Sequence, residues 1–402
     1  MERTGYILAG WLIDGSGGAA QKRMLLTIVN GRFASIDRYE KDNAPDPALV
    51  TDLSHCTIVP PLVDCHVHLA SSPSVELNPE QLPLTGSYAE IKPLITRHLQ
   101  DNFFYGVFAV RDAGDHYGHV LHYKMDSGAG FNEPVIVKTA GRGWHQKGGY
   151  GNLIGRFPDR GETLSGSFAK EDEPIDHVKI INSGPVSLRD FGGETPPQFD
   201  PAELKKIVSL AREKGKKVMV HANGLIPVRQ AVEAGCHSIE HGFFMGRDSM
   251  GLMAEEGTTW VPTAVIMKSC LEDILKKYRL EGDPAVVKKN LQHQLEQISM
   301  ARECGVTVAL GTDAGRPGIL HGESMVEEMR LLMKGGYSLP EAIRCGSYNG
   351  AQLLGIEEDS GLISRGRPAH FIAARGTPSQ LPRKLSYLEA VYVNGKPRTI
   401  II

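Results

Sequence analysis

Between residues 58 and 360 the chain alternates short apolar runs with stretches of helical periodicity, and this rhythm limits the fold more than any other feature. Near-continuous apolar strands that alternate with helices indicate a parallel sheet whose two faces are covered. The rhythm predicts an α/β fold and favours a (β/α)8 TIM barrel, because the span from His66 to Asp313 is close to the about 250 residues of a typical barrel. The runs are CTIVPPLVDCHVHL, VFAVRDAG, PVIVKTAG, HVKIINSG, KVMVHAN, HSIEHG, TTWVPTAV and VTVALGTDAG.

Both ends of the chain have a different pattern, made of short alternating runs that are closed by glycine or aspartate. The tripeptide Val-Asn-Gly occurs at 29–31 and again at 393–395, and in both places it predicts a hairpin turn. We therefore predict a small β-sandwich domain built from residues 1–57 and 361–402. The catalytic barrel, residues 58–360, is then inserted between the two parts of that domain.

Helices are predicted between most of the apolar runs. Residues 201–214 have apolar side chains at helical spacing, with Pro201 in the first turn and Gly215 as the stop signal. Further helices are predicted over 273–304, with a break near 282–284, and over 322–334 and 339–354.

The composition excludes several functional classes. The 402 residues include 44 basic and 47 acidic side chains, so the net charge of −3 gives no footprint for nucleic acid and no sign of binding to an anionic membrane. No apolar run approaches the about 18 residues of a transmembrane helix, and the start of the chain lacks the pattern of a signal peptide. The 6 cysteines are scattered without a C-x-x-C pair, so we expect a reduced, cytoplasmic compartment.

Residues of the metal-binding types lie at the strand ends where barrel enzymes hold their active sites. His66 and His68 are two apart on the first strand, so both side chains point to the same face and can reach one metal ion. The later strands contribute Lys179 on the fourth, His221 on the fifth, His241 on the sixth and Asp313 on the eighth.

Each of these residues also has a structural interpretation. A single buried histidine is more often a hydrogen-bonded core residue than a ligand, and a single aspartate at a strand end is more often a turn or helix cap. A lysine in an apolar strand can extend its ammonium to the surface, although burial of that charge is costly. Because all of them fall on one rim of the predicted barrel, we interpret them as one site.

The order His-x-His, Lys, His, His, Asp along the strands resembles the amidohydrolase superfamily, and the resemblance covers nearly the whole chain. The segments HVKIINSG, HANG, EHG and GTDAG resemble its binuclear branch, which holds prolidase-like metal-dependent dipeptidases and related amide hydrolases. The closing run GLISRGRPAHFIAARG resembles the return of the family's chain into the sandwich. Residues 60–62 read Pro-Pro-Leu where the family usually has Pro-Gly, and His370 replaces an aspartate that is not a metal ligand.

The resemblance implies two divalent metal ions. One ion would be held by His66, His68 and Asp313, the other by His221 and His241, and Lys179, carboxylated by carbon dioxide, would bridge the two. A hydroxide that bridges the ions would attack the scissile carbonyl, and Asp313 would act as the catalytic acid and base. The histidine and carboxylate donors favour zinc, with manganese and cobalt as alternatives.

Two long glycine-rich loops follow the third and fourth predicted strands and carry basic and aromatic residues, and Arg316 follows Asp313 closely. Arginine binds carboxylates well through paired hydrogen bonds, so we hypothesise a small-molecule substrate that bears a carboxylate. The prolidase-like relatives place a histidine of the third-strand loop against the substrate, and His145 is the candidate counterpart. The alternative is a solvated loop with incidental charges. The candidate substrate-binding residues are His145, Tyr150, Arg142, Arg189 and His321.

Three further histidines, His116, His119 and His122, recur every three residues after the second predicted strand. They could share a helix face and bind a metal, but we predict a solvated helix face instead. Asp112, at the end of the same strand, is predicted to be structural.

We predict a metal-dependent amidohydrolase that cleaves a C–N amide bond of a small substrate, such as a dipeptide or an N-acyl amino acid. A mononuclear deaminase is one alternative, against which Lys179 argues because such relatives typically lack that lysine. A lactone or ester hydrolase on the same scaffold is a second alternative. A non-catalytic assembly protein is a third, although such relatives have usually lost metal ligands. The exact substrate and the oligomeric state, a homo-oligomer included, are left open.

Overall fold

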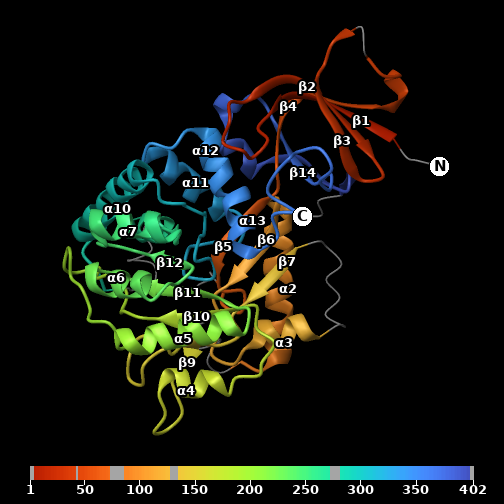
Figure 1. Cartoon of the computed structure of the whole chain (residues 1–402). Coiled ribbons are helices and arrows are strands. Elements are labelled where there is room, and N and C mark those ends of the chain that lie inside the picture. The colour runs from red at the N-terminus through yellow and green to blue at the C-terminus, as the bar shows by residue number, and fades with distance from the viewer. Residues whose placement is uncertain (1–3, 42–43, 73–85, 127–134, 272–280, 399–402) are drawn as a thin grey trace.

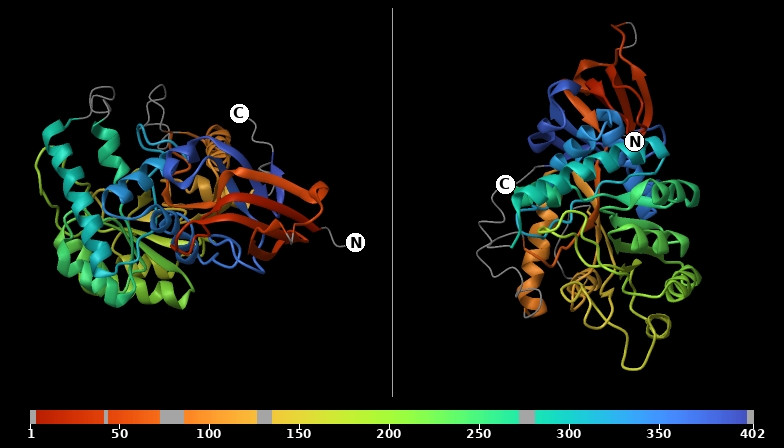
Figure 2. Two further views of the ribbon diagram at one scale, coloured as in Figure 1. Left: turned by 90° about the horizontal axis from the view of Figure 1, so that it is seen from above. Right: turned by 90° about the vertical axis from the view of Figure 1, so that its left-hand side faces the viewer.

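The structure is a computed structural model that describes residues 4–41, 44–72, 86–126, 135–271 and 281–398. Its strands form a seven-stranded sheet, a six-stranded sheet and a three-stranded sheet. The seven-stranded sheet lies at one end of the molecule, and the helices gather around the other strands (Figure 1). Figure 2 shows the same division from two further sides.

The seven-stranded sheet combines both ends of the chain. Strand β14 from the C-terminal part pairs antiparallel with β4, and β4 pairs parallel with β1, so the two ends share one hydrogen-bonded sheet. In sheet order its strands are β16 (Lys396–Arg398), β15 (Leu388–Val393), β14 (Phe371–Arg375), β4 (Val50–Val59), β1 (Thr4–Leu12), β2 (Gln21–Val29) and β3 (Arg32–Arg38). The sandwich arrangement and the domain limits at 57 and 361 stay predictions.

Both Val-Asn-Gly segments form two-residue hairpin turns, as predicted. In the turn between β2 and β3, Asn30 has φ 52° and Gly31 has φ 79°, and Asn394 and Gly395 repeat this with φ 50° and 72° between β15 and β16. Two successive positive φ angles define the turn whose twist matches that of the flanking strands. Asparagine tolerates the left-handed region and glycine enters it without cost, which explains this residue pair.

The remaining strands form two parallel sheets, and seven of the eight predicted runs contribute a strand to them. The three-stranded sheet consists of β5 (Leu62–Val67), β6 (Val107–Asp112) and β7 (Ile136–Thr139). In sheet order the other consists of β13 (Thr259–Val261), β12 (Ser238–His241), β11 (Lys217–Ala222), β10 (His177–Ile181), β8 (Gly143–Trp144) and β9 (Gly155–Arg156). The two-residue strands β8 and β9 were not predicted.

The eighth predicted run does not form a regular strand, so that part of the prediction is wrong. Residues 306–315 instead contribute isolated bridges, of which Trp260 to Val308 and Val67 to Ala314 join them to the neighbouring strands. The backbone still lies between β13 and β5, because Ala309 N donates to Trp260 O on one side and Cys65 N donates to Leu310 O on the other. The positive φ of Asp313, 60°, turns the chain out of the extended conformation that a longer strand needs.

The parallel strands and the helices around them form a TIM-barrel-like α/β fold (Figure 1). At the second junction between the parallel sheets, Asp176 N, just before β10, donates to Thr139 O at the end of β7. Bounds of the helices are α2 (Tyr88–Phe104), α3 (His119–Met125), α4 (Leu164–Ala169), α5 (Pro201–Glu213), α6 (Leu225–Glu233), α7 (Gly246–Glu256), α8 (Val265–Ser269), α10 (Pro284–Cys304), α11 (Ser324–Lys334), α12 (Leu339–Cys345) and α13 (Tyr348–Leu354), with short 3-10 turns η2 (Pro47–Leu49), η4 (Pro378–Gln380) and η5 (Arg383–Ser386).

The helix signals in the sequence are confirmed where they were strongest. Helix α5 begins with Pro201 after the cap Asp200, whose side chain accepts from Ala202 N. Helix α10 begins in the same way, with Pro284 after Asp283, and residues 273–280 of the longer predicted helix lie outside the described residues. The helix predicted over 339–354 is in fact two helices, α12 and α13, that are separated around Gly346.

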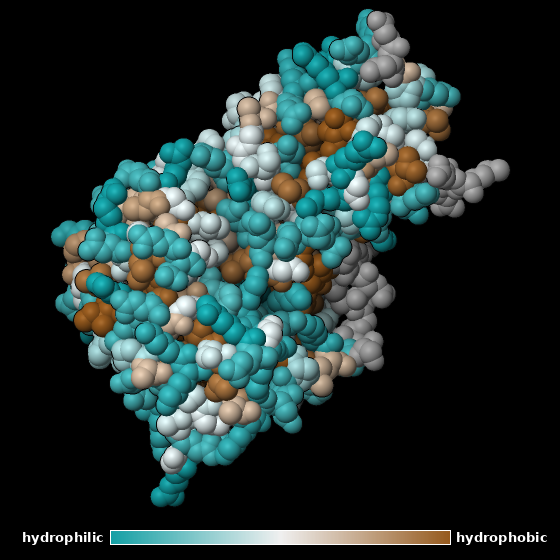
Figure 3. Space-filling model, in the orientation of Figure 1, coloured by the Kyte–Doolittle hydropathy of each residue, from teal (hydrophilic) through white to brown (hydrophobic). Residues whose placement is uncertain are grey.

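Buried apolar side chains form one large core between the parallel strands and their helices and a smaller one within the seven-stranded sheet. The face in Figure 3 is mainly hydrophilic, with small groups of hydrophobic residues. None of the helices in the described part of the chain is long and apolar enough to span a membrane.

Candidate active site

His66 and His68 lie at the carboxyl end of β5, and both are buried. Their Nε2 atoms face Asp313, at 3.4 Å and 3.1 Å from Oδ1. The other ring nitrogens are engaged elsewhere: Nδ1 of His66 lies 2.9 Å from Glu240 Oε2, and Nδ1 of His68 lies 3.0 Å from Gly114 O. Bonds of this kind fix the tautomer and leave Nε2 of both rings for a metal ion.

His221 is the penultimate residue of β11 and His241 the last residue of β12, and their ring centroids are 4.6 Å apart. Nε2 of His221 lies 3.1 Å from Gly184 O, and Nδ1 of His241 lies 2.7 Å from Thr263 Oγ1. One ring nitrogen of each histidine is again left for a metal ion. Burial lowers the pKa of both rings, to about 3 for His221, so both are in the neutral form that binds metals.

Asp313 follows the last apolar run and lies between the two pairs of histidines. Its Oδ2 accepts a 2.5 Å hydrogen bond from Arg316 Nε, and Arg316 Nη2 donates to Tyr150 Oη at 2.7 Å. Burial alone would raise the pKa of Asp313, but the Arg316 guanidinium and the neighbouring His66 hold it well below its usual range. The side chain is therefore a carboxylate, which is the form that binds a cation.

Lys179 lies in the middle of β10 and is only 1% exposed. Its Nζ has no hydrogen-bond partner among the described residues, which is unusual for a buried amine. Burial lowers the pKa of Lys179 to about 8. An ammonium without a partner is expensive to bury, whereas carboxylation would turn this side chain into an oxygen ligand.

These side chains fit divalent metal ions. Candidate ligand atoms of His66, His241 and Asp313 all lie within 4.8 Å of one another. Neutral imidazoles and carboxylates are the donors that zinc and related divalent ions prefer. Together with the unpartnered Lys179, the donor set suits the metal centre that was predicted from the sequence.

A cavity of about 240 Å³ opens onto these ligands. Its polar lining consists of Tyr150, Asn223 and Arg316 beside the candidate ligands His221, His241 and Asp313. The remaining walls are largely apolar and come from the segment after β10, from α8 and from the turn after Asp313; they include Val186, Leu188, Ile266, Met267, Phe243 and Ile319. The cavity can therefore take a small molecule that combines an apolar group with a polar one.

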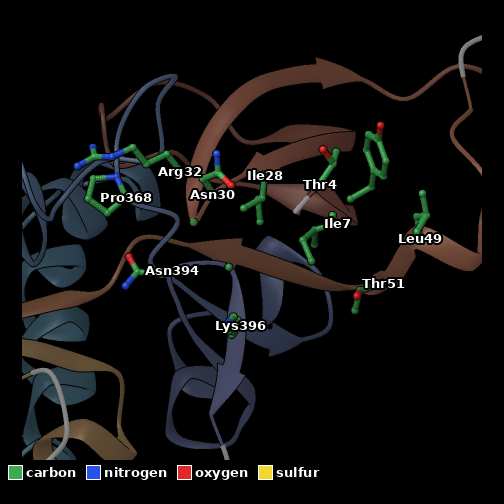
Figure 4. A pocket seen from close by; sticks show the side chains of 14 residues that line it. Thr4, Ile7, Ile28, Asn30, Arg32, Leu49, Thr51, Pro368, Asn394 and Lys396 are labelled. Atoms are coloured by element: carbon green, nitrogen blue, oxygen red, sulfur yellow. The ribbon is translucent and has the colours of Figure 1, made fainter. Parts of the chain in front are cut away.

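A larger hollow of about 680 Å³ lies on the seven-stranded sheet, between Ile7, Ile28, Leu49 and the hairpin residue Asn394 (Figure 4). It contains none of the proposed metal ligands. We take the smaller cavity as the candidate active site, because candidate metal ligands and an apolar wall both line it.

The candidate substrate-binding residues fall in different places. Of them, only Tyr150 lines the cavity. His145 is buried, with Nδ1 2.9 Å from Gln146 O and Nε2 without a partner. Arg142 pairs with Glu173 and Arg189 with Glu281. His321 is buried against His98, with ring centroids 4.0 Å apart.

The three histidines around α3 do not share one solvated helix face, so that prediction is wrong. His116 precedes the helix, and its Nδ1 lies 2.9 Å from Asn152 O. His119 is buried, with Nε2 3.2 Å from Gly86 O, whereas the exposed His122 stacks on Tyr88 with centroids 3.8 Å apart. Asp112 is structural, as predicted, because its carboxylate accepts from Leu69 N and Gly114 N beside His68.

Sequence reasoning missed the residues that support the ligands. Glu240 accepts from Arg111 Nη2 at 2.8 Å and lies against His66, and Thr263 contacts His241. Asn223 accepts from Phe243 N and donates to Gly184 O, which ties three strand ends together. The one signal in the sequence for these supporting residues was Glu240, which directly precedes His241 in the segment EHG.

Known proteins and one protein family resemble this chain in sequence. A model of the amidohydrolase family matches residues 57–402. Ochratoxinase from Aspergillus niger is 30% identical over 206 residues, which cover 50% of this chain and 41% of that protein. Imidazolonepropionase from Acinetobacter baumannii is 27% identical over 183 residues, which cover 44% of this chain and 39% of that protein. The matched segments thus span less than half the length of both relatives.

Solved structures resemble the chain over almost its whole length. The crystal structure of a Xaa-Pro dipeptidase with methionine bound in its active site has a TM-score of 0.80 at 27% identity and covers 98% of this chain and 100% of its own. The crystal structure of A. niger ochratoxinase has a TM-score of 0.79 at 21% identity, with 98% and 95% covered, and shares the fold. Since the family model covers most of the sequence, the chain belongs to the amidohydrolase family.

Proposed function

We propose that this protein is a metal-dependent hydrolase that cleaves the C–N amide bond of a small substrate. The observation that carries the proposal is the meeting of His221, His241 and Asp313 at one end of a cavity with apolar walls, with His66 and His68 beside Asp313. The similarity to a Xaa-Pro dipeptidase and to ochratoxinase supports a hydrolase of this kind. A dipeptide or an N-acyl amino acid is the substrate that we propose.

We further propose a site for two divalent ions, with zinc favoured by the donors. One ion would be held by His66, His68 and Asp313, the other by His221 and His241, with Lys179 carboxylated and shared between the two. Bound divalent ions would polarise a substrate carbonyl and lower the pKa of a water molecule.

Asp313 is the proposed catalytic residue. Its carboxylate is ionised, lies at the edge of the cavity and can take a proton from the attacking water and pass it to the leaving amine. Tyr150 is a proposed substrate contact because its hydroxyl lies at the same end of the cavity. His145 remains a proposed contact through its unpartnered Nε2, and Arg142, Arg189 and His321 stay predictions.

We also propose that the parallel strands close into one eight-membered barrel. Residues 306–314 support this, because they bond to β13 on one side and to β5 on the other. The end of β7 and the start of β10 are joined by the bond between Asp176 N and Thr139 O. The β-sandwich of residues 1–57 and 361–402 would then flank a barrel of residues 58–360.

Metal analysis of the purified full chain, expressed with added zinc, tests the metal centre. We expect about two ions per chain for the wild type and fewer for Lys179→Ala. Lys205→Ala, which changes an exposed lysine on α5, is the matched control and should bind metal like the wild type. One ion or none in the wild type would contradict the binuclear site, and two ions in Lys179→Ala would contradict the proposed role of Lys179.

Activity is tested with a panel of dipeptides, N-acyl amino acids, esters and lactones. We expect amide hydrolysis by the wild type, its loss in Lys179→Ala and partial recovery when short carboxylic acids are added. Turnover of esters or lactones without any amide turnover would refute the proposed reaction.

A further inference from the structure

One cationic side chain lines the cavity in the described part of the chain, and it is Arg316. The two arginines that the loops suggested are engaged elsewhere, because Arg142 pairs with Glu173 and Arg189 with Glu281. An anionic group that enters this cavity therefore meets the charge of Arg316 before that of any other arginine or lysine in its described walls.

The guanidinium of Arg316 is held in place and still has free capacity. Nε donates to Asp313 and Nη2 donates to Tyr150 Oη at 2.7 Å, which uses two of the five N–H donors of an arginine. The side chain is 36% exposed, so a ligand can reach it. Because Asp313 and Tyr150 already fix the guanidinium, binding would cost less side-chain entropy than it would at a mobile surface arginine.

The rest of the cavity has a different character. Val186 and Leu188 from the segment after β10, and Ile266 and Met267 from α8, form an apolar wall. Met267 belongs to a buried apolar cluster, and the other three side chains are partly buried and pack against it, so the wall is packed and not a row of isolated side chains. A ligand that fills the cavity therefore combines an anionic group with an apolar side group.

We propose that Arg316, assisted by Tyr150, binds the α-carboxylate of the substrate, and that the apolar wall takes the side chain of the same amino acid. The inference rests on the proposed function and narrows its substrate to N-acyl or N-aminoacyl derivatives of apolar α-amino acids. A guanidinium recognises a carboxylate through two parallel hydrogen bonds, which an ammonium cannot reproduce.

The test measures binding by calorimetry to the metal-loaded full chain, with L-leucine and its α-carboxamide as the paired ligands, because neither contains the N-acyl bond that the enzyme would cleave. The wild type should bind the acid about 10- to 100-fold more tightly than the carboxamide. In Arg316→Gln the acid should bind more weakly, so that the preference for the acid over the carboxamide is lost. In Arg316→Lys that preference should fall about 10-fold. Arg229→Gln, on the outer helix α6, is the matched control and should keep the ratio.

Several outcomes would overturn the proposal. If Arg316→Gln still prefers the acid over the carboxamide as the wild type does, the carboxylate binds elsewhere, for instance to a metal ion. If the preference for the acid depends on Arg189 instead, the earlier prediction that Arg189 binds the substrate carboxylate is restored. If Arg316→Gln weakens the binding of the acid and of the carboxamide equally, Arg316 only positions Asp313. The metal content of each variant is measured to identify that case. If the ratio depends on Arg316 but no amide is hydrolysed, the carboxylate site stands and the proposed reaction fails.

Discussion

The buried pair of Arg111 and Glu240 provides the sharpest test of how the site is supported. Arg111 is only 3% exposed and makes three hydrogen bonds, to Cys65 O at 2.7 Å, to Ser238 Oγ at 2.9 Å and to Glu240 Oε1 at 2.8 Å. Glu240 is fully buried and also lies against Nδ1 of His66. Arg111→Met would remove all three donors and leave the Glu240 carboxylate without its counter-ion.

The expected loss follows from these contacts. Two hydrogen bonds to neutral acceptors contribute about 1 kcal/mol each and the charge-assisted bond about 2 kcal/mol, so Arg111→Met should lower the free energy of unfolding by about 4 kcal/mol. That value agrees with the about 3–5 kcal/mol for the loss of one partner of a buried ion pair. The double variant Arg111→Met/Glu240→Met removes both charges. Its loss in free energy of unfolding should be at least about 2 kcal/mol smaller than the sum of the losses of the two single variants.

Urea unfolding of the metal-free protein, followed by circular dichroism and tryptophan fluorescence, measures these differences without a contribution from metal binding. Arg229→Met, which breaks an exposed pair with Glu233 on α6, is the control and should not change the urea midpoint. The reasoning would be refuted if Arg111→Met cost less than about 1 kcal/mol, or if the losses of the two single variants simply added in the double variant.

Three further predictions concern other parts of the fold. Burial raises the pKa of Glu328, which accepts from Ala264 N, from 4.5 to about 8, so the folded chain keeps a proton that the unfolded chain releases. Stability should therefore fall by up to about 4 kcal/mol between pH 5 and 8 relative to Glu328→Gln in urea titrations, and equal slopes would disprove this. Thr263→Ala removes the partner of His241 Nδ1 and should weaken zinc binding about 10- to 100-fold in competition with a chelator, whereas unchanged affinity would argue against this support. Ile298→Ala opens a cavity in the fully buried face of α10 and should cost about 2–5 kcal/mol in thermal or urea unfolding, while a loss below about 1 kcal/mol would mean that the core closes around it.

The part of the site that the sequence predicts is local in origin. His66 and His68 share a face because side chains alternate along a strand, and this geometry needs no knowledge of the rest of the fold. The hairpins at Asn30 and Asn394 are predictable for the same reason, since two residues determine the turn. Strand and helix periods then place the ligands at corresponding ends of successive strands, although the eighth run gives only isolated bridges.

The part that the sequence does not predict depends on contacts between distant segments. Arg142 and Arg189 are suitable carboxylate ligands by residue type, and only the fold shows that Glu173 and Glu281 already occupy them. Arg316 is equally basic in the sequence, but its place in the cavity depends on a turn that brings it back to Asp313. Only the fold therefore shows which of these arginines lines the cavity.

Backbone strain gives an independent argument that these strand ends were selected for chemistry. His241 has φ 67° and Asp313 has φ 60°, although neither residue is glycine or asparagine, and Thr263 beside His241 has φ 47°. Such conformations cost about 1–3 kcal/mol each and persist only where the surroundings hold them. Here Trp260 Nε1 and Gln294 Nε2 both donate to His241 O, at 3.0 Å and 2.7 Å, and Asp313 N donates to His66 O. Glycine would relieve the strain at His241 or Asp313 but would remove a proposed ligand. The packing and hydrogen bonds of the surrounding strands therefore offset a local cost that the proposed metal centre requires.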